Sequence, residues 1–267
     1  MIKTVVSGAA GRMGTRIVAL MRDMNELALH GAMESASHPA VGSDAGIVAG
    51  TGSAGVSITA DIAAALSGAQ ALIDFSHADS ALAIIRAAAE KGVPTVIGTT
   101  GISREGVEEI SRLAEKIPIV FAPNMSVGVN LLFKVLADVA KVLGDDYDIE
   151  IVEAHHRMKK DAPSGTAMKM AQVIAEAVGR NLDEVGVYER KGMIGERTRK
   201  EIGIQTVRAG DIVGEHTVMF CTPGERVEIT HKASSRDTFA KGALRAAAWI
   251  AGRKPGLYTM QDVLGLR

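Results

Sequence analysis

The sequence predicts an α/β protein with two parts, a Rossmann-like dinucleotide-binding domain and an α+β domain for substrate binding and oligomerisation. Two observations predict the first domain. Short β-branched runs alternate with alanine-rich helical patterns, which is typical of a parallel sheet flanked by helices. A glycine-rich turn also directly follows the first of these runs. The second domain is predicted from a change of pattern past residue 127, where longer strands and helices replace the short alternation.

The first domain is expected to hold five strands and three helices before residue 127. The expected strands are Ile2–Ser7, Leu27–Met33, Ala71–Phe75, Thr95–Gly98 and Ile119–Phe121. The expected helices are Arg12–Met24, Ser80–Lys91 and Arg104–Lys116. A Gly/Ser-rich stretch at 42–57 predicts a long connection. This order resembles a doubly wound nucleotide-binding sheet.

The second domain is expected to contain a mixed or antiparallel sheet, one face of which could be buried against another subunit. Its expected helices are Val127–Leu143 and Thr166–Val178, and its expected strands are Tyr147–Glu153, Glu201–Arg208, Thr217–Cys221 and Arg226–His231. A helix at Arg236–Gly252 follows, and Leu257–Leu266 could return to the first domain. We therefore predict a dinucleotide-binding domain from residues 1–126 and 236–267, and a substrate-binding and oligomerisation domain from residues 127–235.

Composition excludes several classes of protein. The chain has 267 residues, 47% of them hydrophobic, and a net charge of −1, so a nucleic-acid or membrane-surface protein is not expected. One cysteine, Cys221, excludes an internal disulfide and a multi-thiolate metal site. No window approaches the length of a membrane span, and the N-terminal apolar run is too short for a signal peptide. We expect a cytoplasmic protein.

The glycine-rich turn predicts a dinucleotide site. Gly8, Gly11 and Gly14 lie at the start of the first expected helix, where glycines let the backbone approach a pyrophosphate. Glu34 ends the second expected strand, where a carboxylate can accept hydrogen bonds from a ribose diol. The alternative is a tight turn with an ordinary surface glutamate. Further polar turns follow the fourth and fifth strands, at Gly98–Gly101 and Ala122–Met125.

A basic stretch from Glu153 to Thr166 predicts an anion site. His155 and His156 can each give a proton near neutral pH. Ser164-Gly165-Thr166 opens a helix whose backbone N–H groups favour an anion, and three cations, Arg157, Lys159 and Lys160, lie between. A small dicarboxylate would satisfy both halves. The alternative is a solvated basic loop.

A dinucleotide site and a basic, histidine-containing anion site together predict hydride transfer to a small carboxylated substrate, because the acceptor then needs a proton donor and nearby cations. Three alternatives remain. A two-domain amino-acid or sugar dehydrogenase shares the glycine turn but does not need the Ser-Gly-Thr helix start. A nucleotide-sensing module does not need His155 with Lys159. A metal hydrolase is disfavoured because His155 and His156 point to opposite faces if the strand continues, and no ligand set completes a site, so no metal is expected.

The same residues carry a family resemblance. The motif Glu153-Ala154-His155-His156-Arg157, followed by Lys159 and by Asp161-Ala162-Pro163-Ser164-Gly165-Thr166, resembles the signature of the 4-hydroxy-tetrahydrodipicolinate reductase (dihydrodipicolinate reductase) family. The resemblance also covers the glycine turn, Gly98–Gly101, Asn124–Asn130, Val207–His216 and Glu228–Arg236, so it takes in nearly the whole chain.

The resemblance implies a reaction and a role for each site residue. It implies NAD(P)H-dependent reduction of 4-hydroxy-tetrahydrodipicolinate, via dihydrodipicolinate, to tetrahydrodipicolinate in the diaminopimelate route to lysine, by a homotetramer. His155 matches the proton donor and Lys159 the lysine beside it. His156, Gly165 and Thr166 match contacts to the substrate carboxylates. The implied cofactor contacts are Gly8, Ala9, Ala10, Gly11, Arg12, Met13, Glu34, Gly98, Thr99, Thr100, Ala122, Pro123, Asn124 and Met125.

Two departures from the family pattern affect these expectations. Where some members carry arginine after the ribose-binding glutamate, this chain has Ser35, which brings no cation to a 2′-phosphate. We therefore expect NADH to be used at least as well as NADPH, unless Arg12 or His38 supplies the charge. Met158 stands where some relatives have a third histidine, which the expected reaction does not require. Lys160 follows Lys159, and position in the motif favours Lys159 for the site.

Overall fold

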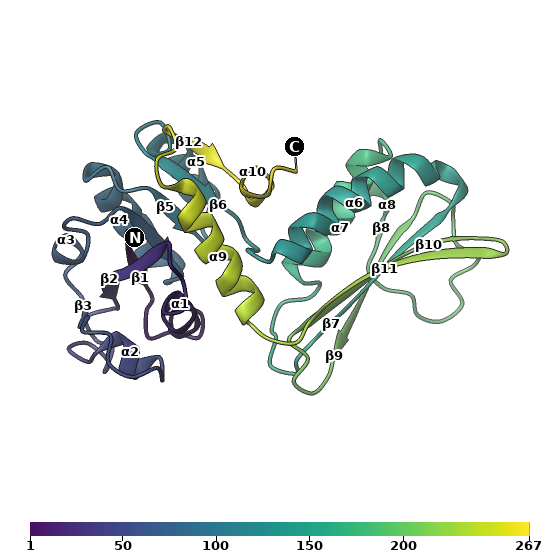
Figure 1. The fold of residues 1–267 in the computed structure, drawn as a ribbon. Helices are drawn as coiled ribbons and strands as arrows, with labels where there is room; N and C mark the ends of the chain where they lie inside the picture. The colour runs from purple at the N-terminus through teal and green to yellow at the C-terminus, as the bar shows by residue number, and fades with distance from the viewer. Residues whose placement is uncertain (267) are drawn as a thin grey trace. The chain divides into compact units, whose positions relative to one another are not determined.

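The protein is described by a computed structural model that covers residues 1–266. The chain splits into two compact units (Figure 1). The first unit comprises Met1–Val127 together with the described residues from Arg236 onward, and the second unit is Gly128–Ser235. Among residues 1–266, no helix is both long and apolar enough to cross a membrane.

The first unit is built on a parallel sheet of seven strands in the order β12-β6-β5-β4-β1-β2-β3. The strands are β1 (Ile2–Ser7), β2 (Leu27–Met33), β3 (Ile58–Thr59), β4 (Ala71–Asp74), β5 (Thr95–Ile97), β6 (Pro118–Phe121) and β12 (Gly256–Tyr258). The chain moves outward from β1 to β3 and then returns to β4 on the other side of β1. This reversal opens a crevice at the carboxyl ends of β1 and β4, where doubly wound sheets bind ligands. The predicted Rossmann-like fold is confirmed.

Helices cover both faces of this sheet. They are α1 (Gly14–Met21), α2 (Ala45–Val48), α3 (Ile62–Ala65), α4 (Ala78–Glu90), α5 (Arg104–Leu113), α9 (Asp237–Ile250) and α10 (Met260–Leu264). On one face, Ile17 of α1 and Leu244 of α9 share a buried core with strand residues such as Val6. On the other face, Ile85 of α4 and Ile110 of α5 pack together against the sheet. Such two-sided cover is what an all-parallel sheet requires.

The predicted first helix begins late because residues 8–13 form a turn. Gly11 N–H donates to the Gly8 carbonyl, with a nitrogen–oxygen distance of 3.0 Å, and α1 starts only at Gly14. The stretch at 42–57, predicted to be a plain connection, contains the short helix α2. Asp44 caps this helix by accepting hydrogen bonds from Gly46 and Ile47, and it also accepts from Ala54 N–H. One aspartate therefore organises much of this connection.

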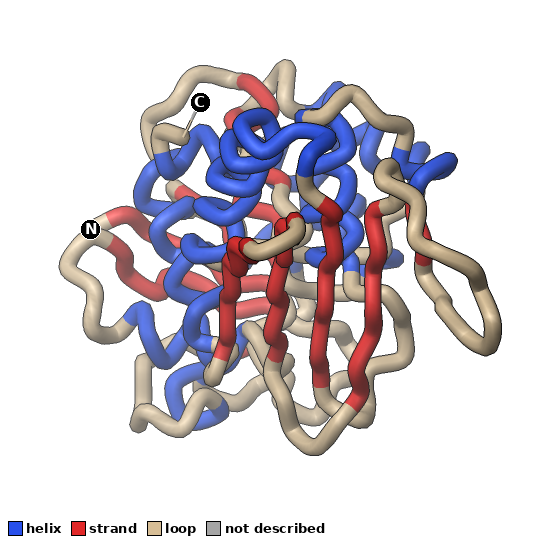
Figure 2. The backbone as a smooth tube through the Cα atoms, turned by 90° about the vertical axis from the view of Figure 1, so that its right-hand side faces the viewer, coloured by secondary structure: helices blue, strands red, loops and turns tan. Residues whose placement is uncertain are grey.

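The second unit is a mixed sheet, one of the two forms predicted, and helices cover one face of it. The strand order is β11-β10-β7-β9-β8, with β7 parallel to β9 and antiparallel to β10. Figure 2 shows the long strands of this sheet side by side, in red. The elements are α6 (Val127–Leu143), the 3₁₀ turn η1 (Gly144–Asp146), β7 (Asp148–His155), α7 (Gly165–Ala177), α8 (Leu182–Val185), β8 (Gly186–Val187), β9 (Ile202–Arg208), β10 (Gly214–Thr222) and β11 (Glu225–Ala233). Leu136 of α6 and Met170 of α7 are fully buried in one core with Ile151 and Phe220 of the sheet. Alternate strand residues therefore face the helices.

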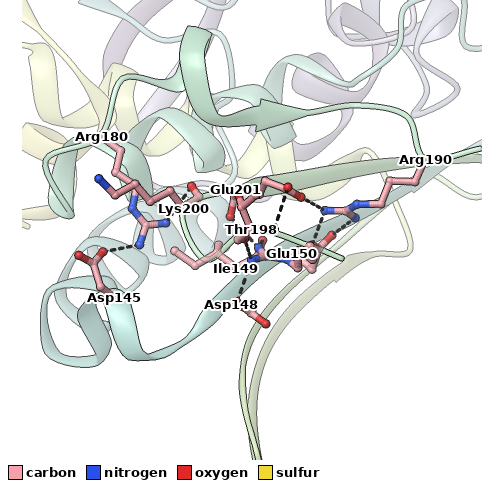
Figure 3. A network of polar contacts seen from close by, with 10 residues as sticks. Asp145, Asp148, Ile149, Glu150, Arg180, Arg190, Thr198, Lys200 and Glu201 are labelled. Atoms are coloured by element: carbon pink, nitrogen blue, oxygen red, sulfur yellow. Dashed lines mark hydrogen bonds and ion pairs between the residues drawn. The ribbon is translucent and has the colours of Figure 1, made fainter. Parts of the chain in front are cut away.

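An ion-pair network fastens the segment before β9 to the start of β7 (Figure 3). Arg190 donates to both carboxylate oxygens of Glu150 at 2.8 and 2.9 Å. Arg197 donates to Glu150 at 3.0 Å and to Asp148 at 2.8 Å. Glu201 adds a further acceptor for Arg190. Because the Arg190–Glu150 pair is bidentate and the pairs are joined, they hold the segment better than isolated surface pairs would.

Candidate active site

The glycine turn of the first unit is built by close backbone approach. Gly8 has a positive φ of 71°, and a Cβ there would overlap the carbonyl of Phe75 at the end of β4. A Cβ at Gly14 would overlap the carbonyl of Gly8. These two glycines are therefore required by packing, and they bring the turn against the neighbouring strand end.

Glu34 lies against this turn. Its carboxylate accepts a hydrogen bond from Ala10 N–H at 3.2 Å and another from Ser35 N–H at 3.1 Å. Gly8, Gly11, Glu34 and Ser35 line one cavity of about 420 Å³. A carboxylate beside a cavity at a topological switch point has the position required to bind a ribose diol.

The cavity is also lined by residues that the sequence did not single out. Phe75, Ser76 and His77 lead from β4 into α4, and Ser80 lies in its first turn. They were missed because the sequence does not show that β4 lies beside β1. That neighbourhood depends on the strand order.

The other predicted cofactor residues are distributed around the same sheet edge. Ala9 is buried and its N–H donates to the Met33 carbonyl at 3.0 Å, while Arg12 is exposed and Met13 packs on the core. The remaining predicted contacts follow β5 and β6 and are not among the described residues that line the cavity: Gly98, Thr99, Thr100, Ala122, Pro123, Asn124 and Met125. Thr99 is fixed by its hydroxyl, which donates to Asp74 at 2.6 Å.

In the second unit, the basic stretch is organised around Glu153, whose side chain has no exposed surface. Arg208 donates to both carboxylate oxygens at 2.8 Å. Ser164 N–H donates to Oε1 at 3.0 Å, and the hydroxyl of Thr206 lies 3.3 Å from the same oxygen. Burial alone would raise the pKa of Glu153, but the hydrogen bonds from Arg208, His155 and Ser164 lower it to about 2. Glu153 is therefore ionised at neutral pH.

His155 ends β7 on the same face as Glu153. Its Nδ1 lies 2.6 Å from Glu153 Oε2, and the ring packs edge-on to His216 with the ring centroids 5.2 Å apart. The side chain is 12% exposed. Burial lowers the pKa of His155, while Glu153 opposes that shift. The imidazole is thus held in one orientation with its Nδ1 directed inward.

His216 is buried beside this pair. Its Nε2 lies 3.0 Å from the hydroxyl of Ser164. Burial is the main cause that lowers the pKa of His216, to about 4, and the charge of His155 adds to it. His216 is therefore neutral at pH 7 and acts as a hydrogen-bonding and packing partner rather than as a cation.

Lys159 and Lys160 differ in their surroundings. The Lys159 ammonium donates to both oxygens of Asp161, at 2.8 and 2.9 Å, and its side chain is 20% exposed. Its charge also contributes to lowering the pKa of His155, which places it near the imidazole. Lys160 is exposed. His156 is half-buried, and within residues 1–266 its Nδ1 has no hydrogen-bond partner.

The start of α7 lies where the sequence predicted a helix end that could bind an anion. Ser164 caps the helix, because its hydroxyl accepts a hydrogen bond from Ala167 N–H at 3.1 Å. Gly165 and Thr166 form the first turn, and the space around the α-carbon of Gly165 is open. An anion at this end would be favoured by the helix dipole. Among the described residues, no group of three or more His, Cys, Asp or Glu side chains is placed to bind a metal ion.

A Rossmann-like unit with an acid beside its glycine turn, joined to a unit that carries acid–base groups, defines a two-unit, nicotinamide-dependent oxidoreductase. Two family models cover the chain: "Dihydrodipicolinate reductase, N-terminus" matches residues 2–125, and "Dihydrodipicolinate reductase, C-terminus" matches residues 128–264. The chain therefore belongs to the dihydrodipicolinate reductase family, and the predicted resemblance is confirmed.

Relatives that match over the whole chain agree with this membership, and solved structures share the fold. Proteins named 4-hydroxy-tetrahydrodipicolinate reductase from Syntrophus aciditrophicus and Geotalea uraniireducens are each 55% identical over 267 residues, covering all of both chains. The fold is similar to a dipicolinate-bound dihydrodipicolinate reductase from Paenisporosarcina sp. TG-14, with a TM-score of 0.74, 22% identity and 98% of each chain covered. It is also similar to GenD2 in complex with NAD, with a TM-score of 0.62, 11% identity, and 99% and 90% of the two chains covered.

Proposed function

We propose that this chain reduces 4-hydroxy-tetrahydrodipicolinate, via dihydrodipicolinate, to tetrahydrodipicolinate in the diaminopimelate route to lysine. A bound nicotinamide supplies the hydride, and His155 supplies the proton. The observation that carries the assignment of the proton donor is the contact of His155 with the buried Glu153 carboxylate, 2.6 Å away. A positioned imidazole is the kind of group that general acid catalysis uses.

The substrate groups are assigned to the second unit. Lys159 brings an ammonium near His155, and Gly165 and Thr166 lie in the first turn of α7. One substrate carboxylate is assigned to the helix start, and the other to His156 and Lys159. A cationic surround stabilises the negative charge that hydride delivery leaves on the acceptor.

A steady-state assay with freshly made substrate tests the assignment. We expect His155→Ala to lower kcat on the order of a hundredfold, because acid catalysis is lost. Lys159→Ala should lower kcat and raise KM. Lys160→Ala is the matched control, because this neighbouring lysine is exposed, and it should keep both constants within about twofold. Near-normal turnover of His155→Ala would reject the role of His155.

We propose that the enzyme uses NADH at least as well as NADPH. Glu34 accepts hydrogen bonds from two backbone N–H groups and would repel a 2′-phosphate, while Ser35 brings only a neutral hydroxyl. We expect Ser35→Arg to raise NADPH affinity about tenfold with little change for NADH, because a charge-assisted contact to phosphate is added. Ser35→Gln adds a long but neutral side chain and should not raise NADPH affinity. A native enzyme that strongly prefers NADPH and does not respond to Ser35→Arg would contradict this proposal.

The protein is further proposed to be a cytoplasmic homotetramer that assembles through the sheet of the second unit. The sheet face opposite the helices carries Val152 of β7, Val207 of β9, and Thr217 and Met219 of β10, and Val207 is 43% exposed. Burial of such a face between subunits would remove apolar surface from water. Light scattering at micromolar concentration should give the tetramer mass, and a stable, active monomer would contradict it.

A further inference from the structure

Glu153 connects two parts of the second unit that the proposed function uses separately. Its Oε2 contacts the ring of His155, and its Oε1 accepts the backbone N–H of Ser164, which caps α7. The proton donor and the anion-binding helix start are therefore attached to the two oxygens of one carboxylate. No role for Glu153 follows from the sequence beyond its place in the motif.

The direction of the hydrogen bond to His155 follows from the charge of Glu153. Arg208 donates to both oxygens at 2.8 Å, so the carboxylate is compensated and can only accept further hydrogen bonds. Nδ1 of His155 must then carry a hydrogen. The remaining nitrogen, Nε2, is the one that can exchange a proton.

The surroundings of Nε2 leave room for this exchange. A Cβ at position 214 would lie 3.1 Å from Nε2 of His155, so Gly214 keeps the space beside this nitrogen open. The carbonyl of His155 accepts Ala209 N–H at 3.0 Å, and the N–H of Arg157 donates to the Gly210 carbonyl at 3.1 Å. These bonds fix the backbone on both sides of the imidazole.

We propose that Glu153 is the positioning residue of the proton donor: its buried carboxylate holds His155 as the Nδ1–H form, so that Nε2 exchanges the proton with the substrate, and its charge favours the protonated ring. This inference rests on the proposed role of His155. Glu153 acts through the imidazole and is not assigned a contact with the substrate.

The charged and titratable groups that face His155 come from several elements. They are Glu153 on β7, Arg208 on β9, His216 on β10 and Lys159 in the loop after β7. Burial, Lys159 and Arg208 lower the pKa of His155, whereas Glu153 raises it. Removal of the Glu153 charge therefore leaves only effects that favour the neutral ring, and the enzyme should lose its acid form at a lower pH.

Glu153→Gln tests the inference, because it keeps the volume and one acceptor oxygen but removes the charge. We expect the alkaline limb of the kcat/KM profile to move about one pH unit lower, with kcat/KM at pH 8 reduced about tenfold. Glu153→Asp keeps the charge and should return the limb to within about half a pH unit of the wild-type position, although its shorter reach lowers kcat. A purely structural role would lower kcat in both variants without moving the limb, and that result would overturn the inference.

Glu150→Gln is the matched control. Glu150 lies on the same strand and also binds two arginines, but its ion pairs belong to the network at the other end of β7 (Figure 3). Its substitution should leave the pH limb unchanged. If His155→Ala keeps normal turnover, the proposed function itself fails. If His155→Ala is slow but Glu153→Gln keeps the wild-type limb, only this inference fails.

A measurement on the unaltered protein tests the inference even if the Glu153 variants do not fold. The ¹⁵N chemical shifts of neutral His155 distinguish which ring nitrogen carries the hydrogen. We expect the Nδ1–H form. Observation of the Nε2–H form would overturn the inference, whatever the variants show.

Discussion

Asp74 and Glu153 are both fully buried carboxylates near the ends of strands, one in each unit, yet their surroundings shift their ionisation in opposite directions. Glu153 accepts hydrogen bonds from the guanidinium of Arg208, whereas Asp74 accepts a hydrogen bond from the neutral hydroxyl of Thr99 at 2.6 Å. Burial raises the pKa of Asp74, and hydroxyl neighbours offset that only in part. The pKa of Glu153 is instead lowered to about 2. Burial alone therefore does not decide ionisation. The charge of the hydrogen-bond partner decides whether the buried carboxylate is ionised.

Of the substitutions that test this comparison, removal of Arg208 should change the free energy of unfolding most. We expect Arg208→Ala to lower the free energy of unfolding at pH 7 by about 3–5 kcal/mol, because Glu153 is left as an uncompensated buried charge. The loss should shrink in acid, where Glu153 can take a proton. Chemical denaturation at pH 7 and pH 5 measures both effects.

Arg86→Ala is the control for this variant. Arg86 also donates to both oxygens of a glutamate, Glu109, at 2.5 and 2.7 Å, but the arginine side chain is 52% exposed. Water can replace these contacts, so its loss should be far smaller. Equal losses for the two variants would show that burial of the acceptor is not what makes the Arg208 pair important.

A second test extends the comparison to a buried base. The pKa of His216 is lowered to about 4, mainly by burial, so between pH 6.5 and pH 4 the unfolded chain binds the proton that the folded protein rejects. Stability must therefore fall as the pH drops through this range, by at most about 1.4 kcal/mol per pH unit. His216→Gln can still bond to Ser164 and should lose about 2 kcal/mol less between pH 7 and pH 5. The same pH dependence in both proteins would contradict the low pKa of His216.

Asp74→Asn should give the smallest effect and the opposite sign. Because the folded state raises the pKa of Asp74, the folded protein binds a proton that the unfolded chain has already released, and stability declines as the pH rises above about 4. The amide of the variant needs no such proton, so the variant should be more stable than the unaltered protein at pH 7, and the difference should disappear near pH 4. Asp79→Asn, at a 92% exposed position, is the matched control. A marked loss at pH 7 would mean that Asp74 is ionised and paired.

The sequence predicted the fold well where elements are long and strongly patterned. The bounds of β1, β2 and α6 are those expected, and the glycine turn lies where its spacing indicated. The strands β3 and β8 have two residues each, and α3 has four. Elements this short carry too few residues for a period to appear, so they were missed.

The candidate site was predictable only in part, for a related reason. His155, Lys159 and the start of α7 lie in one motif, so local sequence brought them together. Arg208 and His216 join them through pairing, because His155 is opposite Arg208 on β9 and Glu153 is opposite His216 on β10. The sequence shows neither register. The charge state of Glu153 therefore depends on partners that only the assembled sheet provides.

The chain order of the two units has a consequence for synthesis. Three elements of the first unit, α9, β12 and α10, follow the whole second unit in the chain (Figure 1). Leu244 and Ile250 of α9 fill the core around β1, so that core stays incomplete while the ribosome makes residues 128–235. We expect the second unit to fold first during translation, although its residues are made later than β1. The first unit then exposes apolar surface until α9 emerges from the ribosome.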